Sequence, residues 1–199
     1  MLRNRLTLAA SVCAVTAAVS LRADGVTRRD ADSMRQKVAF ITQLGERPDT
    51  QIHRTTVTEN EVNAYLAYDA PSDLPTGVIE PAVTLLGPGR ISAHAVVDLD
   101  AVRRQRSATS AFDPMSYLSG RLPVAVTGAL TTSNGVARFD LESATVSNVP
   151  VPKAMLQQIL SHYSRTSANP GGIVLDDPFP LPARIREIQL LQGQAIVVQ

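Results

Sequence analysis

The chain has 199 residues, enough for one domain with its own hydrophobic core. Apolar residues make up 44% and aromatic residues only 4%, so the core must be built from Val, Leu, Ile and Ala, and long disordered stretches are not expected. The formal net charge is +1, from 19 Lys and Arg against 18 Asp and Glu, and this balance argues against a nucleic-acid-binding surface.

The first 23 residues have the pattern of a targeting segment. Arg3 and Arg5 give a positive start, and the uncharged apolar run Leu6 to Leu21 follows. Because this run is shorter than the about 20 residues of a membrane-spanning helix, we expect a secretory signal peptide, with an uncleaved N-terminal anchor as the alternative. Cys13 lies inside the run and is the one cysteine, so the remaining domain, residues 24–199, has no thiol chemistry. We therefore expect an exported, periplasmic protein.

Two amphipathic helices are expected early in this domain. Apolar side chains recur at helical spacing between Val26 and Leu44. A short strand, His53 to Val57, comes next. Thr58 and Glu61 then have the spacing of a capping box, in which the first side chain binds the N3 backbone N–H and the second binds the N-cap N–H. The sequence therefore predicts that a second helix begins directly after Thr58.

The middle of the chain is typical of antiparallel strands. Residues 77–86 and 90–99 flank a Gly-Pro-Gly turn, and the second of these runs alternates apolar with polar side chains, as a half-buried strand does. Asn134-Gly135 lies between two further alternating runs and is a strong hairpin signal. The alternation changes after Ser143, which indicates a β-bulge there. Between the two hairpins, residues 100–120 predict a short helix or a mobile connection.

Prolines introduce the last elements. Pro152 fits the first position of a helix that carries one apolar stripe, and residues 182–191 and 194–199 pair as a final hairpin. The sum is a single α+β domain in which a bent, mostly antiparallel sheet of about six strands packs against amphipathic helices.

Catalytic motifs are scarce. The chain has neither a G-x-S-x-G nor an H-E-x-x-H sequence. His94 and Asp98 share one face of a strand, but their Cα atoms would be about 13 Å apart, which favours a solvated polar face over an acid/base pair. We therefore expect no enzyme, no metal site and no cofactor, and we keep a hydrolase that uses His94 as the last alternative.

A basic cluster is the other polar candidate. Arg103, Arg104 and Arg106 are placed to meet anionic headgroups at a membrane surface. The alternative is that they form the solvated face of a helix, as most charge runs do.

The order of segments resembles that of the bacterial exported LmeA/YpmS-like lipid-binding families, which are related to the tubular lipid-binding (TULIP) superfamily. The similarity covers Val57 to Val198. The run Val149-Pro150-Val151-Pro152 with Leu156 and Leu160 matches the strand-to-helix junction of these families. The entry helix of these families is matched by the helix that begins after Thr58, at Thr58, Glu61, Val62 and Leu66. The insert at 100–120 is an addition to the family pattern, either a lid or a partner contact.

This resemblance implies a long helix wrapped by a strongly bent sheet, with an acyl-chain groove between them. It implies lipid binding or shuttling in the cell envelope, without bond chemistry. An envelope scaffold protein whose filled core leaves no groove, and which binds another protein, is the alternative. The apolar groove positions that the resemblance implies are Val62, Leu66, Val151, Met155, Leu156, Ile159 and Leu160.

Overall fold

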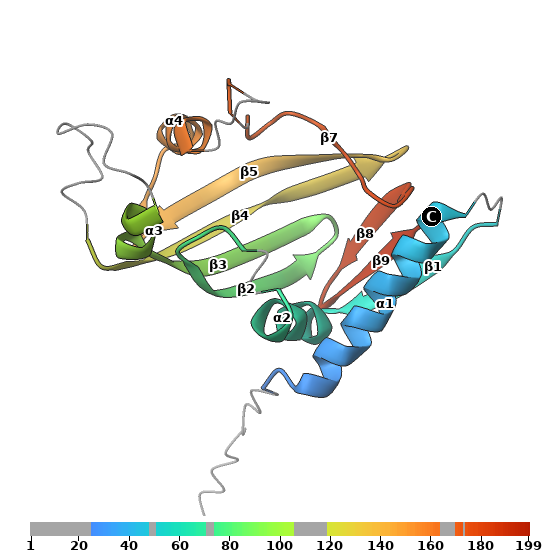
Figure 1. Ribbon diagram of the computed structural model, residues 1–199. Helices are drawn as coiled ribbons and strands as arrows, with labels where there is room; N and C mark the ends of the chain where they lie inside the picture. The colour runs from blue at the N-terminus through green and yellow to red at the C-terminus, as the bar shows by residue number, and fades with distance from the viewer. Residues whose placement is uncertain (1–24, 48–50, 71–73, 106–118, 164–169, 173) are drawn as a thin grey trace, which may run out of the picture.

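The computed structural model describes residues 25–47, 51–70, 74–105, 119–163, 170–172 and 174–199 (Figure 1). Helices combine with mostly antiparallel strands, so the predicted α+β class is confirmed. The predicted targeting segment lies outside the described residues. Within them, every helix is too short or too polar to span a membrane.

The elements agree closely with the sequence prediction. Each predicted helix and strand is present. Of the two predictions for residues 100–120, the short helix forms at Leu99–Gln105, and residues 106–118 lie outside the described residues. In chain order the elements are α1 (Arg28–Glu46), β1 (Arg54–Thr58), α2 (Glu59–Tyr68), β2 (Val78–Gly87), β3 (Arg90–Asp98), α3 (Leu99–Gln105), β4 (Arg121–Ser133), β5 (Val136–Val146), β6 (Val149–Pro150), α4 (Lys153–Tyr163), β7 (Phe179–Pro180), β8 (Glu187–Leu191) and β9 (Gln194–Val198).

The larger sheet has six strands in the order β2-β3-β4-β5-β6, with β7 also paired to β5. Asn134 and Gly135 join β4 to β5, and both have positive φ angles, 50° and 80°, as a type I′ hairpin turn requires. The predicted bulge is confirmed. Thr127 pairs with Ser143 while the next residue of β4 pairs with Leu141, so Glu142 is the extra residue.

The final hairpin joins a different sheet from the one expected. β8 and β9 pair with β1 in a separate three-stranded sheet of order β1-β9-β8, which lies across the hairpin ends of the larger sheet (Figure 1). Val57, Leu85, Leu190 and Ala195 form the buried core between the two sheets. The Thr132 hydroxyl fixes the crossing, since it both donates to and accepts from the backbone of β8.

Side chains of α2 occupy the free edge of β2, where a further strand would otherwise add. The Asn63 amide donates to the Val83 carbonyl at 2.8 Å and accepts from the Val83 N–H at 2.7 Å. A carboxylate oxygen of Glu59 accepts from the Leu85 N–H at 2.7 Å. These contacts satisfy the outward backbone groups of Val83 and the Leu85 N–H, and Gly193 in the turn of the final hairpin donates to the Leu85 carbonyl at 2.9 Å. The final hairpin therefore meets the β2 edge with its turn and does not extend this sheet.

The longest helix, α1, has 19 residues and packs along α2 and β1 (Figure 1). Arg35 of α1 pairs with Asp69 at the end of α2 at 2.8 Å. Gly45 lets the end of α1 approach the chain before β8, because a Cβ there would lie 2.6 Å from the backbone of Ala183. The helix therefore braces the three-stranded sheet and leaves the larger sheet's own face free.

Candidate hydrophobic ligand site

The larger sheet has one apolar face and one polar face. The register places Ala93 of β3 beside Val126 of β4, and Val126 beside Ala144 of β5, all on one side. Ser92 and Thr127 belong to the other side, where their hydroxyls are hydrogen-bonded at 3.1 Å. Each face continues across the central strands because side chains alternate along every strand.

Within the described part of the chain, the apolar face is buried at Leu85 of β2 and at Ala144 of β5 and is less covered between them. Leu85, beneath β8, is buried, whereas Ile91, Ala93, Val126 and Leu130 are half-buried. An open groove of about 220 Å³ lies over this half-covered region. Its lining is entirely apolar and comes from β3, β4, β5 and β7, namely Ile91, Ala93, Val126, Leu130, Phe139 and Phe179.

A glycine shapes the floor of this groove. A Cβ on Gly128 would lie 2.5 Å from the ring of Phe139 and 2.5 Å from the carbonyl oxygen of Asp140. The absence of a side chain therefore lets the Phe139 ring lie close against the neighbouring strand. A glycine inside a central strand marks such a close approach.

A second hollow, of about 440 Å³, lies beside the groove, between α4 and the segment that leads to β7. Phe179 lines both hollows, so they share one wall. An ion pair and a hydrogen bond hold the described part of this segment to α4. Lys153 pairs with Asp176 at 2.7 Å, and the Gln157 side-chain oxygen accepts from the Leu175 N–H at 2.7 Å. The remaining lining residues are Leu160, Gly172, Val174, Leu175, Asp177 and Pro178.

The groove positions predicted from the resemblance are spread over two helices. Leu160 lines the second hollow, Val151 and Leu156 are half-buried, and Met155 is 53% exposed. The side chain of Ile159 lies outside the described residues. On α2, Val62 packs against the core between the two sheets and Leu66 is half-buried. The structure thus brings the α4 residues near a hollow and leaves the α2 residues with the core.

The predicted headgroup arginines lie on or after α3. Arg103 pairs with Asp100 at 2.9 Å, Arg104 is exposed, and Arg106 lies outside the described residues. Neither of the first two lines the groove or the second hollow.

His94 and Asp98, the polar pair weighed as an acid/base pair, have different surroundings in the structure. His94 is exposed, whereas Asp98 accepts from the Ala101 N–H at 2.9 Å at the start of α3. This hydrogen bond lowers the pKa of Asp98 against the opposing effect of partial burial, with a further contribution from Arg121. Asp98 therefore serves the helix start. Among the described residues, no group of three or more His, Cys, Asp or Glu side chains is placed to hold a metal ion.

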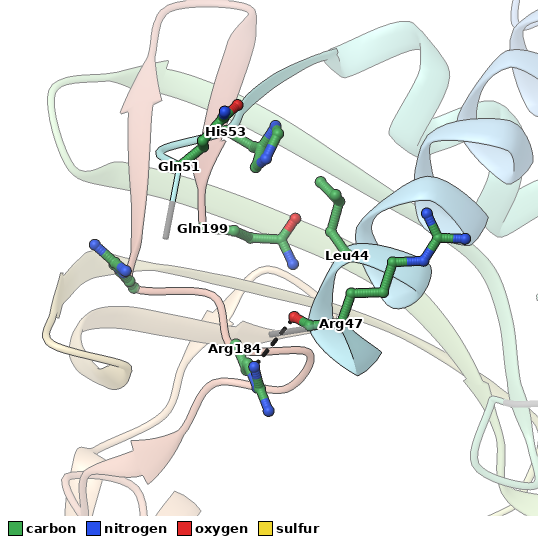
Figure 2. Close-up of a pocket in the computed structure, with 7 residues that line it drawn as sticks. Leu44, Arg47, Gln51, His53, Arg184 and Gln199 are labelled. Carbon is green, nitrogen blue, oxygen red and sulfur yellow. Dashed lines mark hydrogen bonds between the residues drawn. The ribbon is translucent and has the colours of Figure 1, made fainter. Parts of the chain in front are cut away.

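A small polar pocket of about 50 Å³ lies at the end of α1 (Figure 2). Arg47 and Arg184 line it, but the Arg47 side chain extends along α1 while Arg184 donates to the Arg47 carbonyl oxygen at 3.1 Å. The guanidinium groups of these two residues therefore do not converge. The buried amide of Gln199 donates to the carbonyl oxygens of Ile41 and Ala183, which assigns this pocket a structural role.

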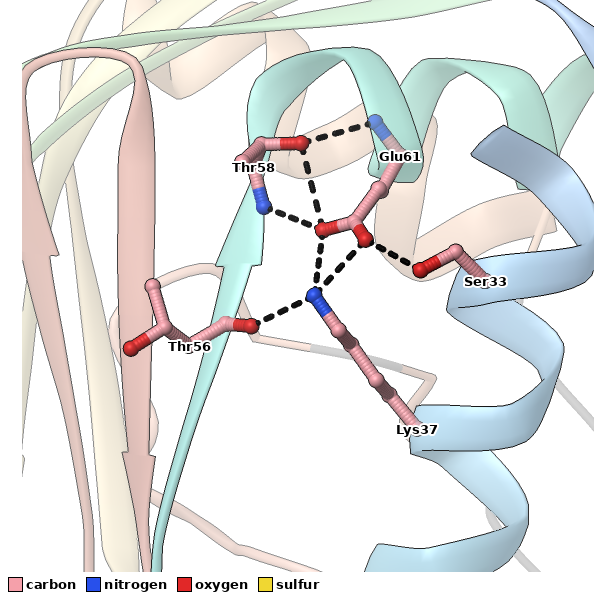
Figure 3. A network of polar contacts seen from close by, with 5 residues as sticks. All are labelled: Ser33, Lys37, Thr56, Thr58 and Glu61. Carbon is pink, nitrogen blue, oxygen red and sulfur yellow. Dashed lines mark hydrogen bonds and ion pairs between the residues drawn. The ribbon is translucent and has the colours of Figure 1, made fainter. Parts of the chain in front are cut away.

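One buried carboxylate has a strongly shifted pKa (Figure 3). Burial raises the pKa of Glu61, but hydrogen bonds from Lys37, Ser33 and the Thr58 N–H outweigh it and bring the pKa down to about 2. The Lys37 ammonium lies 2.7 Å from both carboxylate oxygens and 2.8 Å from the Thr56 carbonyl oxygen. The predicted capping box is confirmed here, and the network joins α1, β1 and α2.

Comparisons with protein-family models, with curated proteins and with solved structures gave no match to this chain. The case for a site therefore rests on the geometry of the sheet. The alternation of Ile91 and Ala93 along β3 was a signal in the sequence, since it predicts an apolar face. Nothing in that alternation distinguishes a covered face from an open one.

Proposed function

We propose that this protein binds a lipid or another elongated hydrophobic ligand and holds its apolar part in the groove over β3, β4 and β5. The observation that carries the proposal is the half-covered apolar face of the larger sheet. That face forms a groove with purely apolar lining and shares Phe179 with a second, larger hollow. Ligand sites are typically apolar hollows of about 300–1,000 Å³ with few polar groups, and the two adjoining volumes suit that description.

Burial of apolar surface supplies the affinity in this proposal. Each methylene group moved from water into an apolar site contributes about 0.8 kcal/mol, so a chain of several methylene groups binds without an ionic anchor. Among the described residues that line the second hollow, Asp177 is the charged one. The polar part of the ligand then faces that end or the solvent.

The proposed setting is the cell envelope. Arg3, Arg5 and the apolar run Leu6 to Leu21 support export. The resemblance to exported lipid-binding families supports a role in carrying lipid rather than in bond chemistry. Contact with a membrane surface through Arg103 and Arg104 belongs to the same proposal.

The test places a large side chain on the groove floor. Ala93 is half-buried beneath the groove, and Ala129 is half-buried on the opposite face of the neighbouring strand. Titration with a fluorescent fatty acid should give saturable binding to the unaltered protein and to Ala129→Phe. Ala93→Phe should bind at least about tenfold more weakly, since the ring displaces about two methylene groups of ligand.

Two outcomes would count against the proposal. One is equal binding by the two variants. The other is the absence of both co-purified lipid in solvent extracts and saturable fatty-acid binding, which would favour a scaffold protein with no hydrophobic ligand.

A further inference from the structure

The outer edge of β5 is paired at its two ends, and no described strand pairs with it between them. β7 pairs with Val136 and Ala137, and β6 pairs with Thr145 and Val146. Among the described residues, no strand pairs with this edge between Ala137 and Thr145. An edge of this kind presents unpaired backbone N–H and C=O groups to any extended chain that reaches it.

The strand alternation identifies which backbone groups face outward. The Gly135 carbonyl accepts from the Leu181 N–H at 2.8 Å, and the Ala144 carbonyl accepts from the Val151 N–H at 2.9 Å, both from outside the sheet. In an antiparallel strand the N–H and C=O of one residue point to the same side, and alternate residues share that side. When the alternation is counted from Gly135, the backbone N–H and C=O groups of Phe139 and Leu141 face outward. The extra residue Glu142 in the bulge brings the backbone groups of Ala144 to the same outer side.

Two features of the described segments limit how far they pair with this edge. Phe179 pairs with Ala137, so Pro178 lies opposite Arg138, where a backbone N–H would point away from β5, and the next N–H that could reach the edge belongs to Asp177. The Asp177 N–H turns back to the Val174 carbonyl at 3.3 Å, so this segment bonds to itself instead of following β5. At the other end, Val151 makes the last contact with the edge before α4 begins.

We propose that this open part of β5 binds an extended peptide segment of another protein as an added strand. Strand addition to a sheet edge is a common mode of peptide recognition, in which the main chain supplies affinity and alternate side chains supply specificity. The edge chemistry favours a peptide over a lipid, since an acyl chain has no donors or acceptors for Phe139 and Leu141.

The flanking side chains define the pattern of the partner. Peptide residues opposite Phe139 and Leu141 would lie on the apolar face, at the rim of the groove. Their neighbours would lie on the polar face, beside Arg138, Asp140 and Glu142. Those charges are already paired within the chain, Arg138 with Asp140 at 3.1 Å and Glu142 with Arg90 at 2.6 Å. The partner is therefore a peptide of alternating apolar and polar residues.

Amide hydrogen exchange tests the state of the free edge. In the free protein, the amides of Phe139 and Leu141 should exchange at least about tenfold faster than those of Arg138 and Asp140, which face β4. Comparable protection of all four amides in the free protein would overturn the proposal, since the edge would then be covered. Protection that rises with protein concentration alone would also overturn it, in favour of a second copy of this chain.

A model peptide tests strand addition itself. A short peptide of alternating valine and lysine, at millimolar concentration, should slow exchange at Phe139 and Leu141. N-methylation of its valines, whose amides would face β5, should weaken binding about tenfold through lost hydrogen bonds, while N-methylation of its lysines should leave it unchanged. Absence of protection by the parent peptide, or equal effects of the two methylation patterns, would overturn the proposal.

A variant of the protein gives an independent reading. Leu141→Pro removes the outward N–H and keeps the ladder to β4, because proline is accepted on an edge strand. Leu141→Ala removes the same side-chain bulk and keeps the N–H. With circular dichroism confirming that both variants fold, the peptide should bind Leu141→Ala and not Leu141→Pro. Equal binding by the two folded variants would contradict the inferred hydrogen bond. If Leu141→Pro does not fold, N-methylation of the peptide decides the question.

Discussion

Replacing Glu61 by glutamine removes the charge at the centre of the network that joins α1, β1 and α2, with almost no change in shape. The carboxylate is buried and held by Lys37, Ser33 and Thr58. Its pKa falls from the usual 4.5 to about 2. Since one pKa unit corresponds to about 1.4 kcal/mol, the ionised group contributes about 3 kcal/mol to the free energy of unfolding.

The pH dependence follows from the direction of this shift. Because the folded-state pKa is lowered, the contribution is complete above the unfolded-state pKa and disappears as the pH falls from about 5 to about 2. Glu61→Gln should therefore be less stable than the unaltered protein by about 3 kcal/mol at pH 7. The difference should fall below about 1 kcal/mol near pH 2, where the Glu61 carboxyl group is about half protonated in the folded protein and neutral in the unfolded chain.

Urea unfolding followed by far-ultraviolet circular dichroism, repeated between pH 2 and pH 7, measures this difference. Circular dichroism is used because the chain has no tryptophan whose fluorescence could report unfolding. Glu46→Gln is the matched control, since that residue is exposed at the end of α1, and it should change stability by less than about 0.5 kcal/mol. A loss below about 1 kcal/mol at pH 7 for Glu61→Gln, or a loss that does not vary with pH, would refute the reasoning.

Two further predictions concern the larger sheet. Asn63→Ala should lower the free energy of unfolding by about 1–3 kcal/mol and increase light scattering, because it leaves the backbone groups of Val83 open at an edge. Asn63→Asp keeps the acceptor but sets a carboxylate oxygen against the Val83 carbonyl oxygen, so it should also lower the free energy of unfolding. Equal stability of all three proteins would argue against this edge cap. Gly128→Ala should cost about 1–3 kcal/mol in thermal unfolding because its Cβ meets Phe139, whereas Gly25→Ala, which meets no atom, should be neutral. An unchanged melting temperature for Gly128→Ala would show that the ring moves aside freely.

The local elements were predictable because their signals are local. Thr58 and Glu61 define a helix start within four residues, and Asn134-Gly135 defines a turn within two. The change of alternation after Ser143 located the bulge for the same reason, since side chains alternate strictly along a strand.

The sheet to which the final hairpin belongs was not predictable in this way. Its position depends on the contacts of Leu190 with Leu85 and on the occupation of the β2 edge by Asn63. These contacts join segments that are far apart in the sequence, and neither residue type signals such a partner. The alternation of β8 and β9 is equally compatible with either sheet.

The sequence predicted that the candidate site would be apolar but did not predict its position in the fold. The apolar face that includes Ile91 and Ala93 was visible as alternation, but covered and open faces have the same sequence pattern. Phe179 reaches the groove only because β7 pairs with Ala137, a long-range contact. The resemblance instead implied groove positions on α2 and α4. Val62 of α2 packs against the core, whereas Leu160 of α4 lines the second hollow.

The most direct test of the central claim is the position of a bound acyl chain, measured by methyl NMR with a fatty acid that carries a spin label near its tail. The proposed function predicts that the methyl signals of Ile91, Ala93, Val126 and Leu130 broaden most, while that of Ala129, on the opposite face, broadens less. Broadening that spares the groove methyls, or that affects both faces of the sheet equally, would contradict a ligand site on the apolar face.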